Sequence, residues 1–197
     1  MGATPVLPQP DQYPFPVGQR MTAAEFALLP AGPPYPELIN SLLKMPPSPE
    51  FSHQEISMEL SSEIHLYSKK NELGIVVTAP MDVHFDENNV FQPDIIFISK
   101  ERLPKLLSDG KKIKGAPDLV AEILSSNKKS ALEEKMSIYE RYDVREYWVV
   151  DPKKKFVEIF ENIDKEFISL QKCKGASTAH SKVLPGFSIE LNKIFRA

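Results

Sequence analysis

The chain has 197 residues, a hydrophobic content of 42% and a formal net charge of −3 at pH 7. This length suits one domain around one core and leaves too little chain for a second full domain. The single cysteine, Cys173, excludes an internal disulfide, and the small negative charge excludes a global attraction to nucleic acid. No apolar run is long enough to span a membrane and the N-terminus lacks the pattern of an export signal, so we expect a cytoplasmic protein with no membrane partner.

Proline dominates the first part of the chain. Half of the eighteen prolines lie within the first 36 residues, and proline cannot donate a backbone hydrogen bond to a helix or a sheet. We therefore predict a Pro-rich extended arm over residues 1–36, with one short helix at 21–29, and a folded domain over residues 37–197.

Helix and strand patterns alternate through the centre of the chain. After a short β element at 36–45, the spacing of Ser52 and Glu55 is typical of a capping box, and apolar residues at helical spacing continue to about Lys70. Three strand-like runs then predict a meander: 74–80, 81–85 and 90–98. A lysine-rich loop leads from there into the next strand.

The second half continues this alternation. A buried strand at 118–124 precedes a second capping box, Ser130 to Glu133, which opens a helix to about Tyr142. A further buried strand is predicted at 145–151. Two or three antiparallel strands follow: 155–161, 166–172 and 181–184. This order of elements predicts an α/β (α+β) fold with a mixed central β-sheet flanked by helices.

Two carboxylates lie in runs that are largely apolar. Asp94 belongs to the run 90–98, and Glu122 is the one polar residue in the run 119–124. A buried carboxylate without a partner costs several kcal/mol, so each requires a metal, a cation or hydrogen-bond donors. A shared divalent cation would satisfy both if the two strands are neighbours. The alternative is an acid at a strand end that reaches solvent, and we assign that structural role to Asp118.

Lys135 lies where its helix should be apolar. It follows Leu132 by three residues and precedes Tyr139 by four, so the three side chains share one face. One interpretation is that Lys135 packs its stem and extends its ammonium group into water. The other places the ammonium group beside the two carboxylates, where it would stabilise negative charge on a phosphate.

Three further residues are auxiliary candidates. Glu37 is a fourth possible ligand from the β element at 36–45, His53 lies near the start of its helix, and Gln92 shares a strand face with Asp94. The sequence has no phosphate-binding glycine loop, no nucleophile elbow and no dinucleotide fingerprint, so we expect no organic cofactor.

Several motifs together resemble a known family. The runs FQPDIIFI, GAPDLVAEILS and EEKMSIYERYDVREYWVVDP are similar to the centre of the Uma-type restriction endonucleases of the PD-(D/E)XK nuclease superfamily, and the likeness extends from MTAAEF to LPGFSIELNKIF. The resemblance implies a restriction-endonuclease-like fold. It also implies that Asp94 and Glu122 are the metal-binding acids. The lysine that usually follows the second acid by two positions is Leu124 here, and Lys135 matches the lysine that some members supply from the next helix.

From these observations we expect a metal-dependent endonuclease that hydrolyses DNA phosphodiester bonds. Hard oxygen ligands favour Mg²⁺ or Mn²⁺, and the resemblance implies DNA as substrate and a homodimer. One alternative is a catalytically inactive nuclease-fold module that binds DNA or a protein partner, with its acids neutralised by Lys135. Another is hydrolysis of RNA or a different phosphoester at the same site.

Overall fold

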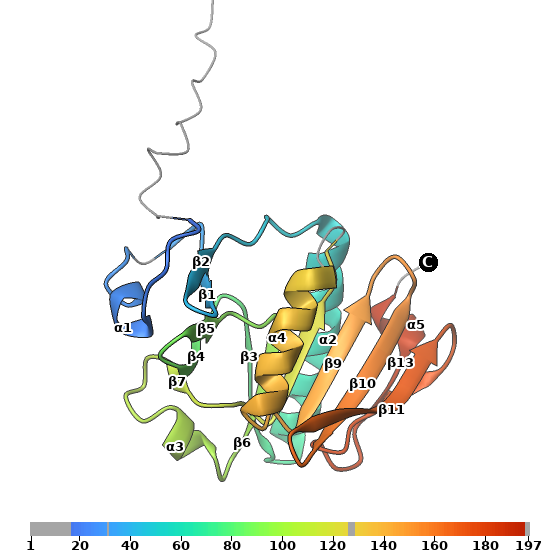
Figure 1. Cartoon of the computed structure of the whole chain (residues 1–197). Coiled ribbons are helices and arrows are strands. Elements are labelled where there is room, and N and C mark those ends of the chain that lie inside the picture. Colours follow the sequence, from blue (N-terminus) through green and yellow to red (C-terminus); the bar gives the residue numbers. More distant parts are fainter. Residues whose placement is uncertain (1–16, 31, 126–128, 196–197) are drawn as a thin grey trace, which may run out of the picture.

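The structure is a computed structural model that describes residues 17–30, 32–125 and 129–195. Its main body is a six-stranded mixed sheet with the strand order β11-β10-β9-β8-β6-β3 (Figure 1). Its strands are β3 (Gly74–Thr78), β6 (Ile95–Ser99), β8 (Leu119–Ile123), β9 (Glu146–Asp151), β10 (Phe156–Ile163) and β11 (Glu166–Lys174). Strands β8 and β9 run parallel, whereas the other neighbours in this sheet run antiparallel.

Two long helices cover opposite faces of this sheet. Helix α2 (Phe51–Lys70) lies behind it and α4 (Lys129–Arg141) in front of it in Figure 1. Along β8, Ala121 joins the hydrophobic core under α2, whereas Val120 joins the core under α4. Because side chains alternate along a strand, Glu122 projects toward α4.

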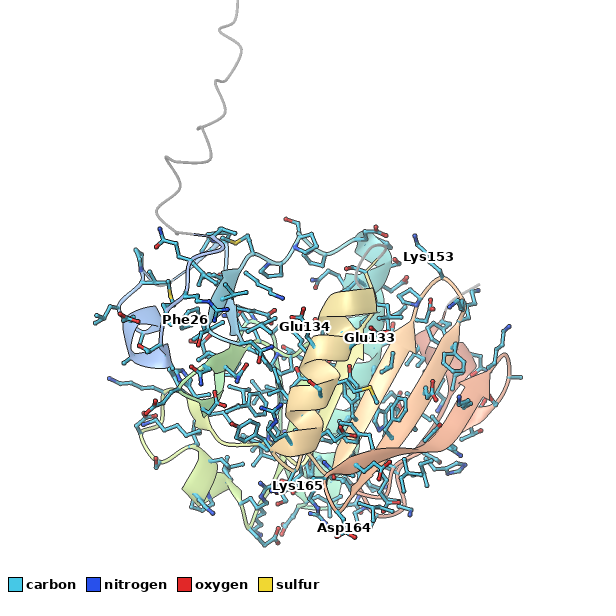
Figure 2. The ribbon with its side chains drawn as sticks, viewed as in Figure 1. Phe26, Glu133, Glu134, Lys153, Asp164 and Lys165 are labelled. Atoms are coloured by element: carbon cyan, nitrogen blue, oxygen red, sulfur yellow. The ribbon has the colours of Figure 1, made fainter. Side chains whose placement is uncertain are left out.

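A second sheet of five short strands, in the order β2-β1-β5-β4-β7, lies beside the first. Its strands are β1 (Glu37–Ile39), β2 (Leu42–Lys44), β4 (Val83–Asp86), β5 (Asn89–Phe91) and β7 (Ile113–Lys114). Helix α1 (Ala23–Phe26) packs on this small sheet through Phe26, which lies between the helix and the strands (Figure 2). The remaining elements are α3 (Leu103–Leu106), β12 (Thr178–His180), β13 (Ser188–Glu190) and α5 (Leu191–Ile194).

The predicted fold class is confirmed, but the predicted meander is wrong. Strand β3 pairs with β6 in the large sheet, whereas β4 pairs with β5 in the small one. Pro80 separates β3 from β4, and the predicted single strand 90–98 divides into β5 and β6 at Gln92-Pro93-Asp94. Proline has no backbone N–H to donate to a ladder, so each proline coincides with a transfer of the chain between sheets.

Two local predictions are also wrong. Helix α2 begins at Phe51 with Glu50 as its N-cap, so Ser52 already lies in the first turn and forms no capping box. Residues 181–184 are not a strand, because the Ser181 hydroxyl and the amides of Lys182 and Val183 donate to the buried carboxylate of Glu146.

Other predictions concern parts of the chain that are only partly described. The predicted helix at 21–29 is limited to α1, which Thr22 and Glu25 open with a capping box. Most of the predicted arm and the side chain of Ser130 lie outside the described residues, so the division at residue 37 and the second capping box stay predictions. Within the described ranges, no helix combines the length and the apolar sequence needed to cross a membrane.

Candidate active site

The break between β5 and β6 brings Asp94 next to β8. Oδ2 of Asp94 accepts a hydrogen bond from the backbone N–H of Ile123 over 2.7 Å. Nε2 of His53, from the first turns of α2, lies 3.2 Å from the same oxygen. The carboxylate of Asp94 is therefore fixed beside the residue that follows Glu122.

Glu122 points from β8 toward α4, as its position in the strand requires. Its Oε1 accepts a hydrogen bond of 2.6 Å from the buried hydroxyl of Tyr139. Nζ of Lys135, one turn earlier on the same helix, lies 3.3 Å from that oxygen. Because Lys135 and Tyr139 are four residues apart on α4, both donors reach the same carboxylate oxygen.

Lys135 forms the centre of the cluster. Besides Glu122, its Nζ contacts Oε1 of Glu37 over 2.7 Å, and it lies 5.7 Å from the ring centroid of Phe91. The side chain of Lys135 is 11% exposed, so its ammonium group points into the protein. Glu37 reaches the cluster from β1 of the small sheet and also accepts the backbone N–H of Gln92 over 3.0 Å.

The electrostatics follow from this burial. Burial, with added repulsion from Asp94 and Glu37, raises the pKa of Glu122 to about 7 against the lowering effect of Lys135. Burial alone would lower the pKa of Lys135, but the carboxylates of Glu122 and Glu37 outweigh it and raise that pKa. Burial likewise opposes the charged form of His53, and its contact with Asp94 more than compensates, so the pKa of His53 is raised.

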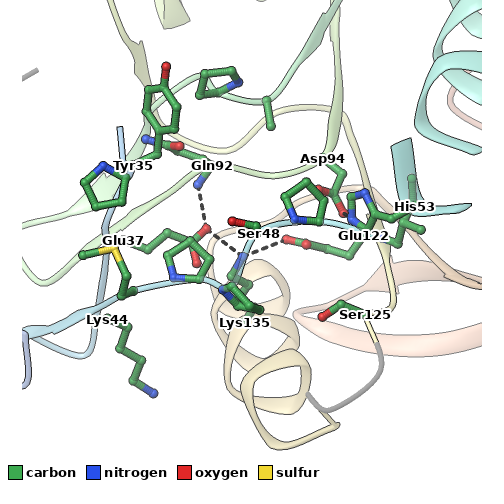
Figure 3. A pocket seen from close by; sticks show the side chains of 18 of the residues that line it. Tyr35, Glu37, Lys44, Ser48, His53, Gln92, Asp94, Glu122, Ser125 and Lys135 are labelled. Atoms are coloured by element: carbon green, nitrogen blue, oxygen red, sulfur yellow. Dashed lines mark hydrogen bonds and ion pairs between the residues drawn. The ribbon is translucent and has the colours of Figure 1, made fainter. Parts of the chain in front are cut away.

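These side chains line one cavity of about 650 Å³ (Figure 3). The structure brings all six predicted residues to it: Glu37, His53, Gln92, Asp94, Glu122 and Lys135. Gln92 contributes mainly its backbone, because its side-chain amide donates to Asp82 over 2.8 Å. Leu124, at the position of the usual lysine, also lines the cavity.

Each of the two proposed metal ligands keeps one carboxylate oxygen without a protein donor. Both contacts of Asp94 are to Oδ2 and both contacts of Glu122 are to Oε1. In the part of the chain that the structure describes, neither Oδ1 of Asp94 nor Oε2 of Glu122 accepts a hydrogen bond. The same part contains no group of three or more His, Cys, Asp or Glu residues that could hold a metal ion.

This donor set fits Mg²⁺ better than a metal that needs a closed protein cage. Mg²⁺ is commonly bound by one or two carboxylates, with water and substrate phosphate oxygens as its other ligands. Two free carboxylate oxygens in a cavity meet that requirement. Zinc would need additional nitrogen or sulfur ligands.

Tyr139 is a residue of the cluster that the sequence does not predict. The helical spacing places it on the apolar face of α4, and in the structure it is fully buried with its hydroxyl in contact with Glu122. A buried tyrosine hydroxyl needs a partner, and its place four residues after Lys135 was the available signal. Asp118 directly precedes β8, but the expectation that it reaches solvent is wrong: its carboxylate is fully buried and pairs with Arg102 and Arg145 at 3.0 Å each.

The comparison with known families agrees with this geometry. Residues 23–192 match the model of the Uma2 family, which is described as "Putative restriction endonuclease". The chain belongs to the Uma2 family. The three central motifs that predicted this relationship, including those around Asp94 and Glu122, lie within the matched region.

A solved structure shares the fold of this Uma2 chain. It is the crystal structure of a protein from Anabaena variabilis ATCC 29413 that is titled a "putative nuclease belonging to DUF820". The TM-score is 0.75 with 20% sequence identity, and the alignment covers 89% of this chain and 97% of the other. No curated protein matches the sequence.

Proposed function

We propose that this Uma2 protein is a metal-dependent endonuclease that hydrolyses phosphodiester bonds of DNA. The observation that carries the proposal is the pair of free oxygens, Oδ1 of Asp94 and Oε2 of Glu122, on carboxylates that the protein holds through their other oxygens. Both carboxylates line the same cavity, so their second oxygens would be available to bind a cation there. The metal would be Mg²⁺ or Mn²⁺.

The charge of the cluster supports a divalent cation. The carboxylates of Glu37, Asp94 and Glu122 carry three negative charges when ionised, and Lys135 carries one positive charge, so the net charge is −2 with His53 neutral and −1 with His53 protonated. A divalent cation would neutralise that charge. Because the raised pKa of Glu122 reflects burial and neighbouring carboxylates, such a cation would also hold Glu122 in its ionised form.

In the reaction, Asp94 and Glu122 would hold the metal, and the bound metal supplies a water of lowered pKa and a contact to a phosphate oxygen. Hydrolysis forms a bond from the water oxygen to phosphorus and breaks one ester bond, and the departing oxygen takes up a proton. Lys135 would stabilise the negative charge that grows on the phosphate oxygens during this exchange.

The other residues of the site position these groups. His53 and the Ile123 amide hold Asp94, while Tyr139 holds Glu122. Glu37 holds the ammonium group of Lys135 from the opposite side. Contacts of this kind fix the orientation of ligands and commonly change metal affinity or activity by 10- to 100-fold, as an order of magnitude.

The second candidate is an inactive nuclease-fold module that binds DNA or a protein partner. It is favoured by Leu124 at the usual lysine position and by the ion pairs of Lys135 with Glu37 and Glu122, which neutralise part of the acidic charge. Millimolar Mg²⁺ or Mn²⁺ affinity separates the two candidates, since a site neutralised by its own lysine should bind neither.

A cytoplasmic location and a homodimer stay predictions. Light scattering of the purified protein tests whether it is a homodimer.

Nicking of supercoiled plasmid with Mg²⁺ or Mn²⁺ tests the proposed activity. We expect wild type to nick, and Asp94→Asn, Glu122→Gln and Lys135→Met to lose nicking while their circular dichroism spectra and melting curves still show a folded protein. Asp109→Asn is the matched control, because Asp109 lies outside the cavity and pairs with Lys114. Nicking that survives in Asp94→Asn would contradict the proposal.

A further inference from the structure

The reactive groups lie inside the cavity rather than on the surface. The side chains of Asp94, Glu122 and Lys135 are 17%, 9% and 11% exposed. A scissile phosphate therefore has to enter the cavity to reach them. In an intact duplex, each phosphate is part of a stiff double helix with a persistence length of about 50 nm.

The cavity is walled by proline. The segment between β2 and α2 contributes Pro46, Pro47 and Pro49, and the chain before β1 contributes Pro33 and Pro34. In Figure 3 this first segment crosses in front of the acidic side chains, with Ser48 drawn over the space between Glu37 and Glu122. These proline rings add apolar surface to the wall around the acidic cluster.

Tyr35 stands at this wall as an exposed aromatic ring. It lines the cavity, is 40% exposed and has a φ of 55°, in the left-handed region that a non-glycine residue rarely adopts. The fold thus holds an aromatic side chain at the cavity at some conformational cost. Exposed aromatic rings in basic or apolar grooves are the usual stacking partners of unpaired bases.

The size of the cavity suits one nucleotide. Its volume of about 650 Å³ lies within the roughly 300–1,000 Å³ range of pockets that enclose a small molecule. Enzymes that act on a nucleotide inside such a pocket take it from a single strand or extrude it from the duplex.

We propose that the Uma2 site acts on unpaired DNA. A nucleotide of a single-stranded segment enters the cavity, its base packs on Tyr35 and the proline rings, and its phosphate reaches Lys135 and the carboxylates of Asp94 and Glu122. Intact duplex is a poor substrate because its backbone stays outside the walls. This inference rests on the proposed nuclease function and specifies its substrate.

Three DNA substrates of one sequence test the inference: a single strand of about thirty nucleotides, the blunt duplex, and the duplex with a central unpaired bubble. With Mg²⁺ we expect kcat/KM on the single strand to exceed that on the duplex by at least about tenfold, the discrimination that loss of one stacked base produces. We expect cuts in the third substrate within the bubble. Fluorescence anisotropy in EDTA measures binding separately from cleavage.

Two variants of Tyr35 test whether its aromatic ring stacks on a base. Tyr35→Ala should weaken single-strand binding in EDTA and raise KM by about tenfold, because stacking on an aromatic ring is lost, whereas Tyr35→Phe should behave like wild type. Phe51→Ala is the matched control, since Phe51 is an exposed aromatic residue on α2 that does not line the cavity.

Three outcomes would overturn the inference in distinguishable ways. Equal cleavage of duplex and single strand, with Tyr35→Ala unchanged, would overturn the preference for unpaired DNA and leave the nuclease function in place. No metal-dependent cleavage of any of the three DNA substrates would overturn both, and cleavage of an RNA strand alone would reassign the substrate.

Discussion

The hydroxyl of Tyr139 donates a 2.6 Å hydrogen bond to Oε1 of Glu122, and both side chains are buried. Among the described residues, no donor contacts the other oxygen, Oε2. Under the proposed nuclease function, Tyr139 would be a positioning residue that acts through Glu122 rather than by contact with the substrate.

Replacing Tyr139 by phenylalanine tests this role. Tyr139→Phe should weaken Mn²⁺ binding and nicking by roughly 10- to 100-fold, the usual effect of removing a hydrogen bond to a metal ligand, while the fold is retained. Titration calorimetry with Mn²⁺ measures the affinity. Tyr142→Phe, directly after the end of α4, is the control, since the Tyr142 hydroxyl contacts Asp86 instead. Equal loss in both variants would point to a general effect on this part of the chain.

Metal binding should depend on pH through Glu122. Because burial raises its pKa to about 7, this carboxylate carries a proton in a substantial fraction of molecules at neutral pH, and a cation must displace that proton. Affinity for Mg²⁺ should therefore rise between pH 6 and pH 8, and binding at pH 7 should release protons. Calorimetry in two buffers of different ionisation enthalpy measures the release, and a pH-independent affinity over this range would contradict the raised pKa of Glu122.

Removal of the metal should lower thermal stability. A ligand at 100 times its Kd stabilises the folded state by about 2.7 kcal/mol, so saturating Mn²⁺ should raise the melting temperature and EDTA should reverse the change. Asp94→Asn and Glu122→Gln should abolish the shift. A shift that persists in both variants would place the cation elsewhere.

Loss of Lys135 should affect the fold as well as the reaction. Lys135→Met leaves Glu37 and Glu122 buried without their cation, and breaking a buried ion pair costs about 3–5 kcal/mol. The double variant Lys135→Met with Glu37→Gln removes one of the two unpaired charges and should recover part of the stability without recovering nicking. Urea unfolding measures the first effect; recovered activity would contradict the role of Lys135.

Acid stability should depend on Asp118, which is outside the site. Burial alone would raise its pKa, but the Ser99 amide and the guanidinium groups of Arg102 and Arg145 outweigh burial and lower it. A depressed folded pKa means that this stabilisation is present above the unfolded value of about 3.8 and is lost as pH falls through the folded pKa. Asp118→Asn should lower the free energy of unfolding at pH 7 by about 2 kcal/mol. It should also make that free energy depend less on pH between pH 5 and pH 2, as measured by urea unfolding.

The sequence predicted the main elements of the large sheet because its buried strands are continuous apolar runs. It also singled out Asp94, Glu122 and Lys135, since charges in apolar surroundings are conspicuous in any pattern of hydrophobicity. Neither inference depends on long-range pairing. Both rest on residues that are near one another in the chain.

What the sequence did not reveal depends on contacts between distant segments. Strand pairing placed β3 and β4 in different sheets, although the two strands are adjacent in the chain. The sequence offered Glu37 only as a possible ligand. Its ion pair with Lys135, 98 residues away, depends on the position of β1 and could not be predicted. The contact of the Tyr139 hydroxyl was not predicted, because helical spacing shows on which face a side chain lies but not which polar group it meets there.

Glu37 belongs to the small sheet, Glu122 to the large one, and Lys135 contacts both. The charged cluster therefore joins the two sheets, and opening of the small sheet would separate its members. Occupation of the cavity should in turn suppress such local opening. Amide hydrogen exchange in β1 would then slow when an ion binds to carboxylates outside β1. Exchange rates in the small sheet would therefore depend on ion binding beside the large sheet.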